Sequence, residues 1–224
     1  MKILTQLQKL GSDNREVAVA LGTFDGVHIG HQKIINRAVE LARITAGTSI
    51  VFTFNNHPLS VLKPDFCPPQ IISRAQKKEI ISGLGVDILL TLSLTREFMQ
   101  LAPAAFIKLL VTNINPRYVV VGQNYSFGYK SAGTPDDLRI AGQRYGFAVE
   151  VCPLVSLDNI VVSSTQIRQS ISEGNVAQAD KLLGRPFKIC GPVITGEHRG
   201  KILGFPTANI GIEPGFAVPR DGVY

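Results

Sequence analysis

A strand–turn–helix segment near the amino terminus constrains the fold of this chain more than any other stretch. The short apolar run Val17–Ala20 predicts a buried strand. The next eleven residues, Leu21–His31, include three glycines, and apolar residues then recur at helical spacing over Gln32–Ala46. Turns of this kind lie at the carboxyl edge of a parallel sheet, where helix N–H groups and the helix dipole favour anions. The segment therefore predicts a phosphate-binding turn in an α/β fold.

Two histidines mark this turn. His28 and His31 are three residues apart, so both imidazoles should project to one side of a helix start. Glycines at positions 22, 26 and 30 permit close approach of the backbone to a ligand. The histidines could hold phosphate oxygens, and two alternatives stay open: a metal-binding pair or two solvated side chains.

Strand and helix patterns alternate along the next hundred residues. The Pro-rich stretch between residues 59 and 70 interrupts them and predicts a long irregular loop. The alternation predicts an α/β fold, a Rossmann-like parallel sheet of about five strands with helices on both faces. Further strands are expected at 48–54, 86–92, 117–121 and 148–151, and helices at 73–84, capped by Ser73, at 95–100, at 103–111 and at 134–146, capped by Thr134.

The pattern changes after residue 184. Short apolar segments separated by Gly and Pro predict the beginning of an all-β domain. We therefore expect two domains, residues 1–184 and 185–224. Roughly 40 residues are too few for a sheet domain with its own core, so either the sequence is truncated or this segment packs on the first domain.

Composition limits the possible partners. The net charge of +6 favours anionic ligands, but the chain has no Lys/Arg-rich run and no tryptophan, which argues against nucleic acid. Its three cysteines include no CxxC pair and predict reduced thiols. No apolar run approaches the roughly 20 residues that span a bilayer. We expect a cytoplasmic protein with small-molecule ligands and no membrane partner; the oligomeric state is not indicated.

Two further segments carry polar groups toward the same sheet edge. Ser163–Arg168 predicts a helix start, capped by Ser164 or Thr165, whose hydroxyls and guanidinium suit a polyphosphate. An ordinary capped helix with a surface arginine has the same pattern. The loop Gly122–Gly128 offers amide and aromatic groups that could contact a nucleotide or, alternatively, belong to the core.

These motifs resemble those of a known family. The stretch GTFDGVHIGHQ, with HIGH at 28–31, is similar to the signature of the nucleotidylyltransferase superfamily. In its full length it resembles the bacterial bifunctional riboflavin kinase/FAD synthetase family. SSTQIR at 163–168 resembles the ISSTxxR motif, GQNYSFG at 122–128 a family loop, and LGFPTAN at 203–209 the riboflavin kinase motif.

The resemblance implies an FMN adenylyltransferase that makes FAD and pyrophosphate from ATP and FMN, with Mg²⁺. The catalytic residues would be His28, His31 and Arg168. Asp25 would position the metal or nucleotide, or simply cap the turn. The implied ATP site consists of Gly22, Thr23, Phe24, Asp25, His28, Gly30, His31, Asn124, Ser163, Ser164, Thr165 and Arg168, and the flavin site of Phe54, His57, Pro58, Asn124, Tyr125 and Phe127.

The kinase motif implies a second nucleotide site at Gly204, Thr207 and Asn209, with Mg²⁺ held by the last two. The rest of that barrel, including its expected general-base glutamate, is missing from this sequence, so we do not expect kinase activity from it as it stands. Two other functions stay open. One is adenylyl or cytidylyl transfer to another small phosphorylated acceptor, and the other is a non-catalytic flavin- or nucleotide-binding module.

Overall fold

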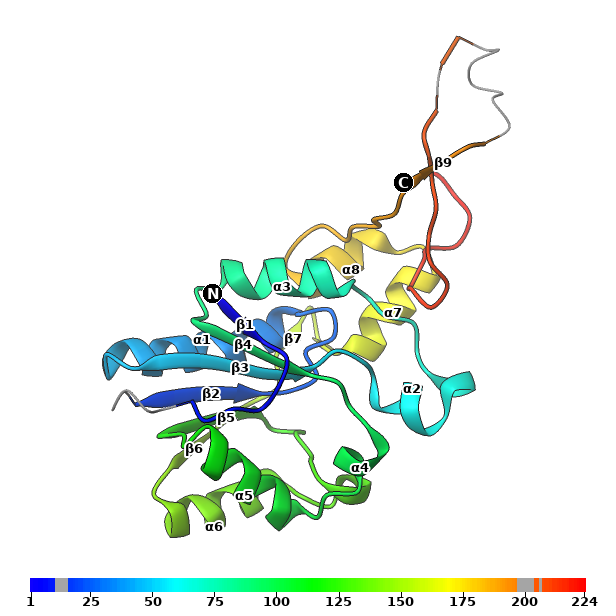
Figure 1. Ribbon diagram of the computed structural model, residues 1–224. Helices are drawn as coiled ribbons and strands as arrows, with labels where there is room; N and C mark the ends of the chain where they lie inside the picture. The colour runs from blue at the N-terminus through cyan, green and yellow to red at the C-terminus, as the bar shows by residue number, and fades with distance from the viewer. Residues whose placement is uncertain (11–15, 197–203, 206) are drawn as a thin grey trace.

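The computed structural model, which describes residues 1–10, 16–196, 204–205 and 207–224, is built on a six-stranded parallel sheet (Figure 1). The strand order is β1-β4-β3-β2-β5-β6, and every neighbouring pair is parallel. The predicted α/β class is therefore confirmed. The strands are β1 (Lys2–Leu4), β2 (Val17–Leu21), β3 (Thr48–Phe54), β4 (Ile88–Leu92), β5 (Tyr118–Gly122) and β6 (Ala148–Cys152).

The edge strand β1 is the one strand of this sheet that the sequence did not predict. It pairs with β4, and the Lys2 backbone N–H donates to the Asp87 carbonyl at 2.7 Å. Ile3 remains 43% exposed, so the three-residue strand buries little apolar surface. The expectation of about five strands was short by one because so short an edge strand leaves no hydrophobic pattern.

Helices cover both faces of the sheet, as predicted (Figure 1). All five residues of the central strand β2 are buried, and they alternate between the two hydrophobic clusters on either side. One face is covered by α1 (Ile29–Ile44), α3 (Arg74–Gly83), α7 (Ser164–Ser172) and α8 (Val176–Leu183), and the other by α5 (Pro103–Asn113) and α6 (Pro135–Tyr145), with α4 (Arg96–Met99) packed beside α5.

Helix capping follows the sequence at two of three sites. Ser73 and Thr134 form the capping boxes of α3 and α6. At α7, however, the cap is Ser163, whose Oγ accepts from the Gln166 N–H at 3.2 Å. The prediction of Ser164 or Thr165 was wrong by one or two residues. Consecutive hydroxyl residues fit a cap equally well, and the burial of the helix's isoleucines decides the register.

The Pro-rich stretch after β3 is not the irregular loop that was predicted. It contains the short helix α2 (Pro58–Leu62) and a 3₁₀ turn, η1 (Pro64–Phe66). His57 Nδ1 accepts from the Leu59 N–H at 3.1 Å and so caps α2, while Pro58 supplies a pre-set φ at its first position. A second 3₁₀ turn, η2 (Tyr129–Ser131), follows β5, and the hairpin β7 (Ser156–Leu157) and β8 (Ile160–Val161) precedes α7.

The segment after α8 both projects from the sheet domain and returns to it (Figure 1). Its hairpin pairs β9 (Val193–Ile194) with β10 (Asn209–Ile210). Ala217 is buried against the first domain and donates its N–H to the Gln70 carbonyl at 2.8 Å. Part of this segment therefore packs on the first domain, which is one of the two possibilities that the sequence left open.

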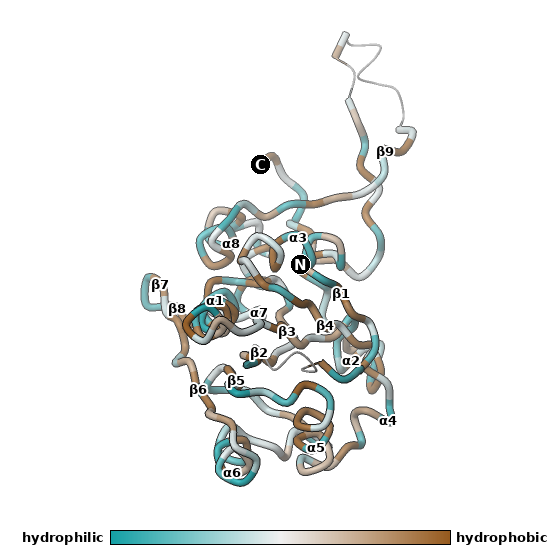
Figure 2. The backbone as a smooth tube through the Cα atoms, turned by 60° about the vertical axis from the view of Figure 1, so that its left-hand side comes forward, coloured by the Kyte–Doolittle hydropathy of each residue, from teal (hydrophilic) through white to brown (hydrophobic). Residues whose placement is uncertain are grey.

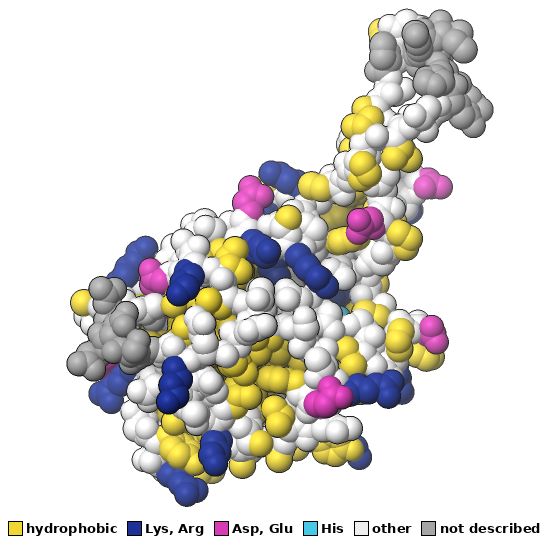
Figure 3. All heavy atoms as spheres, in the orientation of Figure 1, with side chains coloured by type: hydrophobic (Ala, Val, Ile, Leu, Met, Phe, Trp, Pro, Cys, Tyr) yellow, Lys and Arg dark blue, Asp and Glu magenta, His cyan; other side chains and the backbone are white. Residues whose placement is uncertain are grey.

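The surface shows where the remaining apolar residues lie. Val193 of β9 is 74% exposed, and Figure 2 shows hydrophobic residues along this extension as well as in α5. Lys and Arg side chains are scattered over the face seen in Figure 3 and do not gather in one patch. Among the helices of the described residues, none is both long and apolar enough to cross a membrane.

Candidate active site

The turn between β2 and α1 has an unusual backbone. Phe24, Gly26 and Val27 all have positive φ, at 47°, 77° and 41°. The side chains of Phe24 and Val27 are fully buried. Positive φ is rare for a β-branched residue and persists only where its surroundings impose it. The turn is therefore anchored in the core by its apolar side chains, and its backbone lies at the carboxyl edge of the sheet, after β2.

The two histidines begin the helix that follows. His28 is the N-cap of α1, and its Nδ1 accepts from the His31 backbone N–H at 3.2 Å. The two rings are stacked, with centroids 3.5 Å apart, so they lie together on one side of the helix start. Since Nδ1 of His28 accepts a hydrogen bond, the neutral ring carries its proton on Nε2.

Burial keeps both imidazoles neutral. It lowers the pKa of His28 to about 4, and the nearby positive charge of Arg185 lowers it as well. Burial also lowers the pKa of His31 well below its ordinary value, helped by the charges of His28 and Lys77. His31 Nδ1 is buried without a hydrogen-bond partner among the described residues. The pair at neutral pH is thus a set of uncharged ring nitrogens beside a helix N-terminus.

Both histidines line a cleft of about 250 Å³ at the carboxyl edge of the sheet. The start of α7 lines the same cleft through residues 163–165, and Asn124, which follows β5, lines it as well. Gly30 also lines it. The structure therefore places the beginnings of α1 and α7, far apart in sequence, around one cleft.

Arg168 does not line this cleft. It forms a short ion pair with Asp25, and its Nε donates to the Pro69 carbonyl at 2.7 Å. The side chains of Arg168 and Asp25 are 14% and 19% exposed. Ser164 Oγ donates to the Asp25 backbone carbonyl at 3.0 Å. These contacts tie the phosphate turn to α7, and Ser164 also lines the histidine cleft.

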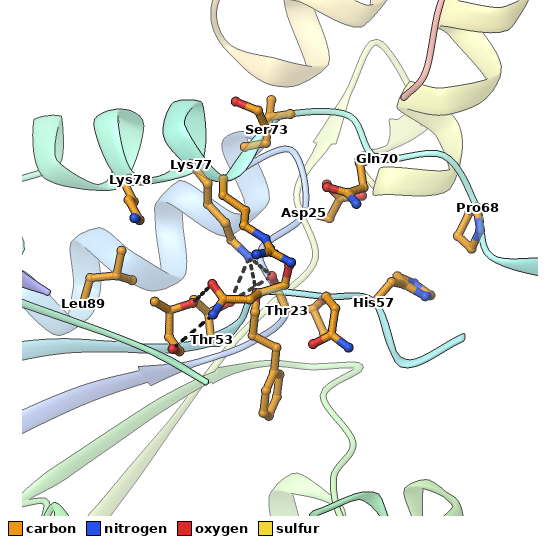
Figure 4. A pocket seen from close by; sticks show the side chains of 16 residues that line it. Thr23, Asp25, Thr53, His57, Pro68, Gln70, Ser73, Lys77, Lys78 and Leu89 are labelled. Atoms are coloured by element: carbon orange, nitrogen blue, oxygen red, sulfur yellow. Dashed lines mark hydrogen bonds between the residues drawn. The ribbon is translucent and has the colours of Figure 1, made fainter. Parts of the chain in front are cut away.

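A second, smaller hollow of about 50 Å³ lies on the Asp25 side of the turn (Figure 4). Thr23, Phe54 and His57 line it, and Pro58 begins the helix that His57 caps. Most of the predicted residues divide between two places: Thr23, Asp25, Phe54 and His57 at this hollow, and His28, Gly30, His31, Asn124, Ser163, Ser164 and Thr165 at the cleft. The others predicted for the ATP and flavin sites line neither: Gly22, Phe24, Pro58, Tyr125, Phe127 and Arg168.

Lys77 of α3 is a residue of this hollow that sequence reasoning missed. Its Nζ donates to the carbonyls of Thr23 and Phe54, at 2.5 and 3.2 Å, and to Thr53 Oγ1 at 3.0 Å. Figure 4 shows the side chain reaching from the helix to these strand ends. Burial lowers its pKa to about 8. A lysine in the middle of an amphipathic helix normally lies at the surface. The sequence around Lys77 therefore did not indicate that its ammonium binds the strand ends.

Two of the aromatic residues predicted near the flavin, Tyr125 and Phe127, pack in or against the core in this structure. Phe127 is 6% exposed and packs on Phe106, with ring centroids 5.1 Å apart. Tyr125 stacks on Phe127, and burial raises the pKa of its hydroxyl. Phe24 is likewise a core side chain. Of the three residues predicted from the loop after β5, only Asn124 lines the cleft.

The residues predicted for the kinase half lie on the projecting hairpin. Gly204, Thr207 and Asn209 are exposed, and the last of them begins β10. Residues 203 and 206 of that motif lie outside the described residues. Within the described part of the chain, no three His, Cys, Asp or Glu side chains gather as a metal would need.

The parallel sheet and the two helix starts around one cleft define an α/β nucleotidyltransferase-like protein. Comparison with known families matches residues 10–166 to the FAD synthetase model and residues 183–224 to the riboflavin kinase model. The chain belongs to the FAD synthetase family, as the motifs predicted.

Individual relatives agree with this assignment. The bifunctional riboflavin kinase/FMN adenylyltransferase of Buchnera aphidicola (subsp. Schizaphis graminum) is 34% identical over 226 residues, covering 100% of this chain and 72% of that protein. The protein of the same name from Listeria monocytogenes is 38% identical, covering 92% and 66%. A crystal structure of a macrolide-efflux protein from Streptococcus pneumoniae superposes with a TM-score of 0.86 at 32% identity, covering 100% and 73%.

Proposed function

We propose that the chain catalyses the adenylyl transfer for which its relatives are named: ATP and FMN give FAD and pyrophosphate. The observation that carries the proposal is the meeting of two helix starts, α1 and α7, at one cleft with two stacked neutral histidines. Helix N-termini bind phosphate through N–H groups and the helix dipole. Two of them facing one space suit a triphosphate.

In this reaction a phosphate oxygen of FMN attacks the α-phosphorus of ATP in line, and the bond to pyrophosphate breaks. No covalent enzyme intermediate is needed, because positioning and electrostatic stabilisation supply the catalysis. We assign the α- and β-phosphates to His28, His31 and the first N–H groups of α1. A ring N–H donor aimed at the departing pyrophosphate would stabilise the negative charge that develops there.

The α7 side of the cleft is assigned to the β- and γ-phosphates. Ser163, Ser164 and Thr165 line it at the start of α7. Arg168 is proposed to contact the same phosphates. Its guanidinium holds the Asp25 carboxylate in this structure, so contact with ATP requires it to exchange that carboxylate for a phosphate oxygen. Asp25 would then be free to orient the nucleotide.

The flavin is assigned to the side of the turn where Phe54, His57 and Pro58 lie. Phe54 and His57 line the small hollow beside Thr23, which belongs to the turn itself. Tyr125 and Phe127 would support this region from the core. Asn124, which lines the cleft, is assigned to the ribose or base of ATP.

Magnesium is expected to arrive with ATP and to neutralise triphosphate charge. In the kinase half, Thr207 and Asn209 would hold it through a hydroxyl and an amide oxygen, donors of the class that Mg²⁺ prefers. Both side chains are exposed on or beside β10, and both are neutral, so phosphate oxygens would have to complete the site. Riboflavin phosphorylation is proposed only for a protein that carries the rest of that domain.

The decisive experiment separates FAD from other products. The chain is incubated with ATP, Mg²⁺ and FMN, and FAD is quantified by chromatography beside FMN formed from riboflavin. FAD formation by the wild type and its loss in the His31→Ala variant support the proposal. Pyrophosphate release only with a non-flavin acceptor would identify a different transferase, and tight ATP or FMN binding without turnover would identify a binding module.

A further inference from the structure

Two side chains hold the backbone of the phosphate turn from outside it. Gln32 Nε2, in α1, donates to the carbonyls of Val27 and Leu183, both at 2.9 Å. Arg185 Nη1 donates to the same two carbonyls, at 3.0 and 3.2 Å, and its Nη2 donates to the Gly26 carbonyl. Gln32 and Arg185, called the turn clamp below, therefore link the turn to the end of α8.

The clamp acts on the most unusual part of the turn. Val27, a β-branched residue at φ 41°, is fully buried and comes directly before His28. Both clamp residues bind its carbonyl, so they fix the peptide whose direction sets where the His28 ring begins. Strained backbone of this kind persists only where several contacts over-determine it. Loss of a clamp donor would let the turn relax and move His28 and the α1 N-terminus.

Arg185 reaches the turn from an unexpected part of the chain. It follows Gly184, the left-handed C-cap of α8, at φ 70°. A Cβ on Gly184 would lie 2.6 Å from Ile29 Cγ2, so the chain must pass close to the start of α1 here. The FAD synthetase match ends at residue 166, whereas Arg185 falls within the 183–224 match to riboflavin kinase. Arg185, which lies in the part matched to riboflavin kinase, thus holds the phosphate turn in the part matched to FAD synthetase.

We propose that Arg185, together with Gln32, is a positioning residue for adenylyl transfer, holding the Gly26 and Val27 carbonyls so that His28 and the α1 N-terminus face the ATP phosphates. The inference rests on the proposed function for the reaction itself. It also predicts that the segment after α8 contributes to ATP binding indirectly, through the turn that Arg185 holds. The domain boundary expected at residue 184 would separate Arg185 from the backbone it holds.

The test compares full-length variants in the FAD assay. Arg185→Met keeps an unbranched apolar stem and removes the guanidinium donors; Arg144→Met, at an exposed site on α6 across the sheet, is the matched control. We expect Arg185→Met to raise KM for ATP about 5-fold and lower kcat about 10-fold, with KM for FMN within about 2-fold of the wild type. A merely smaller amount of folded enzyme would lower apparent kcat and leave both KM values unchanged.

Gln32→Met provides an independent arm should Arg185→Met fail to fold. It should raise KM for ATP as well. In the double variant, the fold-increase in KM for ATP should be smaller than the product of the two single increases, because both side chains hold the same carbonyls. Values of KM for ATP within twofold of the control in the folded variants would overturn the proposal. If the wild type makes no FAD, the proposed function fails, and ATP dissociation constants from equilibrium dialysis test the clamp in place of KM.

Discussion

The imidazole rings of His28 and His31 lie face to face, with centroids 3.5 Å apart and planes inclined by 17°. Two imidazolium ions could not be stacked this closely without strong repulsion, and the lowered pKa values of both groups agree with a neutral pair. An anionic ligand in the cleft would favour protonation of one of the two rings. The protonation state of the two histidines is therefore expected to depend on whether phosphate is bound. Two predictions follow from this pair.

The first concerns catalysis by His31. Replacing it with Ala removes the buried ring whose Nδ1 has no partner among the described residues, and with it a group available to developing charge on pyrophosphate. We expect kcat for FAD formation to fall by around 10²-fold or more. The measurement is steady-state FAD synthesis, with circular dichroism to verify folding. A folded His31→Ala protein with nearly wild-type FAD formation would contradict the assignment.

The second concerns the dependence of stability on pH. His28 titrates near 4 in the folded chain and near 6.5 when unfolded, so between these values the unfolded state binds more protons. Stability should therefore rise with pH from about 4 to 6.5, and His28 should contribute on the order of 2–3 kcal/mol to that rise. His28→Asn retains a capping side chain and does not titrate.

Urea unfolding at several pH values compares the two proteins. Other groups titrate in both, so the difference between wild type and His28→Asn isolates the histidine. The variant should show a shallower increase of unfolding free energy over this range. Parallel curves for the two proteins would mean that His28 is not held neutral by the fold.

The third prediction concerns the ion pair between Asp25 and Arg168. Both side chains are less than one-fifth exposed, so removing either partner leaves a largely buried charge unpaired. We expect Asp25→Asn and Arg168→Met each to lower the unfolding free energy by about 2–4 kcal/mol, and the double variant to lose less than the sum. A double-mutant cycle in urea measures this coupling.

An exposed pair on α6 serves as the control for that cycle. The side chains of Arg139 and Asp136 are 54% and 79% exposed, and their coupling should stay below about 1 kcal/mol. Equal couplings at the two pairs would show that the Asp25 pair does not tie the turn to α7.

The parts of the fold that could be predicted have local signals. β2 is an unbroken apolar run because it is central and buried on both faces. The start of α3 could be predicted because Ser73 and Gln76 have the spacing of a capping box. β1 and α2 were missed because neither has such a signal: one is a short exposed edge strand, and the other begins at a proline in a Pro-rich stretch.

The site divides in the same way. His28 and His31 could be predicted because glycines, a strand and a helix surround them in sequence. Lys77 and Arg185 could not, because the contacts that bring them to the turn are to backbone carbonyls far away in sequence: Thr23 is 54 residues from Lys77, and Val27 is 158 residues from Arg185. A carbonyl is the same in every residue, so no side-chain pattern marks such a contact. The sequence favoured contact with the ligand for Tyr125 and Phe127 and left a place in the core as the alternative. In the structure the two rings stack on each other and pack in or against the core.

The fourth prediction concerns the ammonium of Lys77, which joins the ends of β2 and β3 beside the proposed flavin site. Lys77→Met removes hydrogen bonds to Thr23, Thr53 and Phe54. We expect KM for FMN to rise about 5-fold, because the strand ends that shape the hollow are no longer held together. The measurement is FAD synthesis at varied FMN and saturating ATP.

Lys78→Met is the matched control for this prediction, since Lys78 follows on the same helix and lines the same hollow. The pKa of Lys77 is lowered to about 8, so its ammonium is charged at pH 7 and loses its proton as pH rises through 8. KM for FMN should therefore increase between pH 7 and 9 in the wild type and in Lys78→Met, and should change less in Lys77→Met. The same pH dependence in all three proteins would show that another group is responsible and that Lys77 does not hold this side of the site.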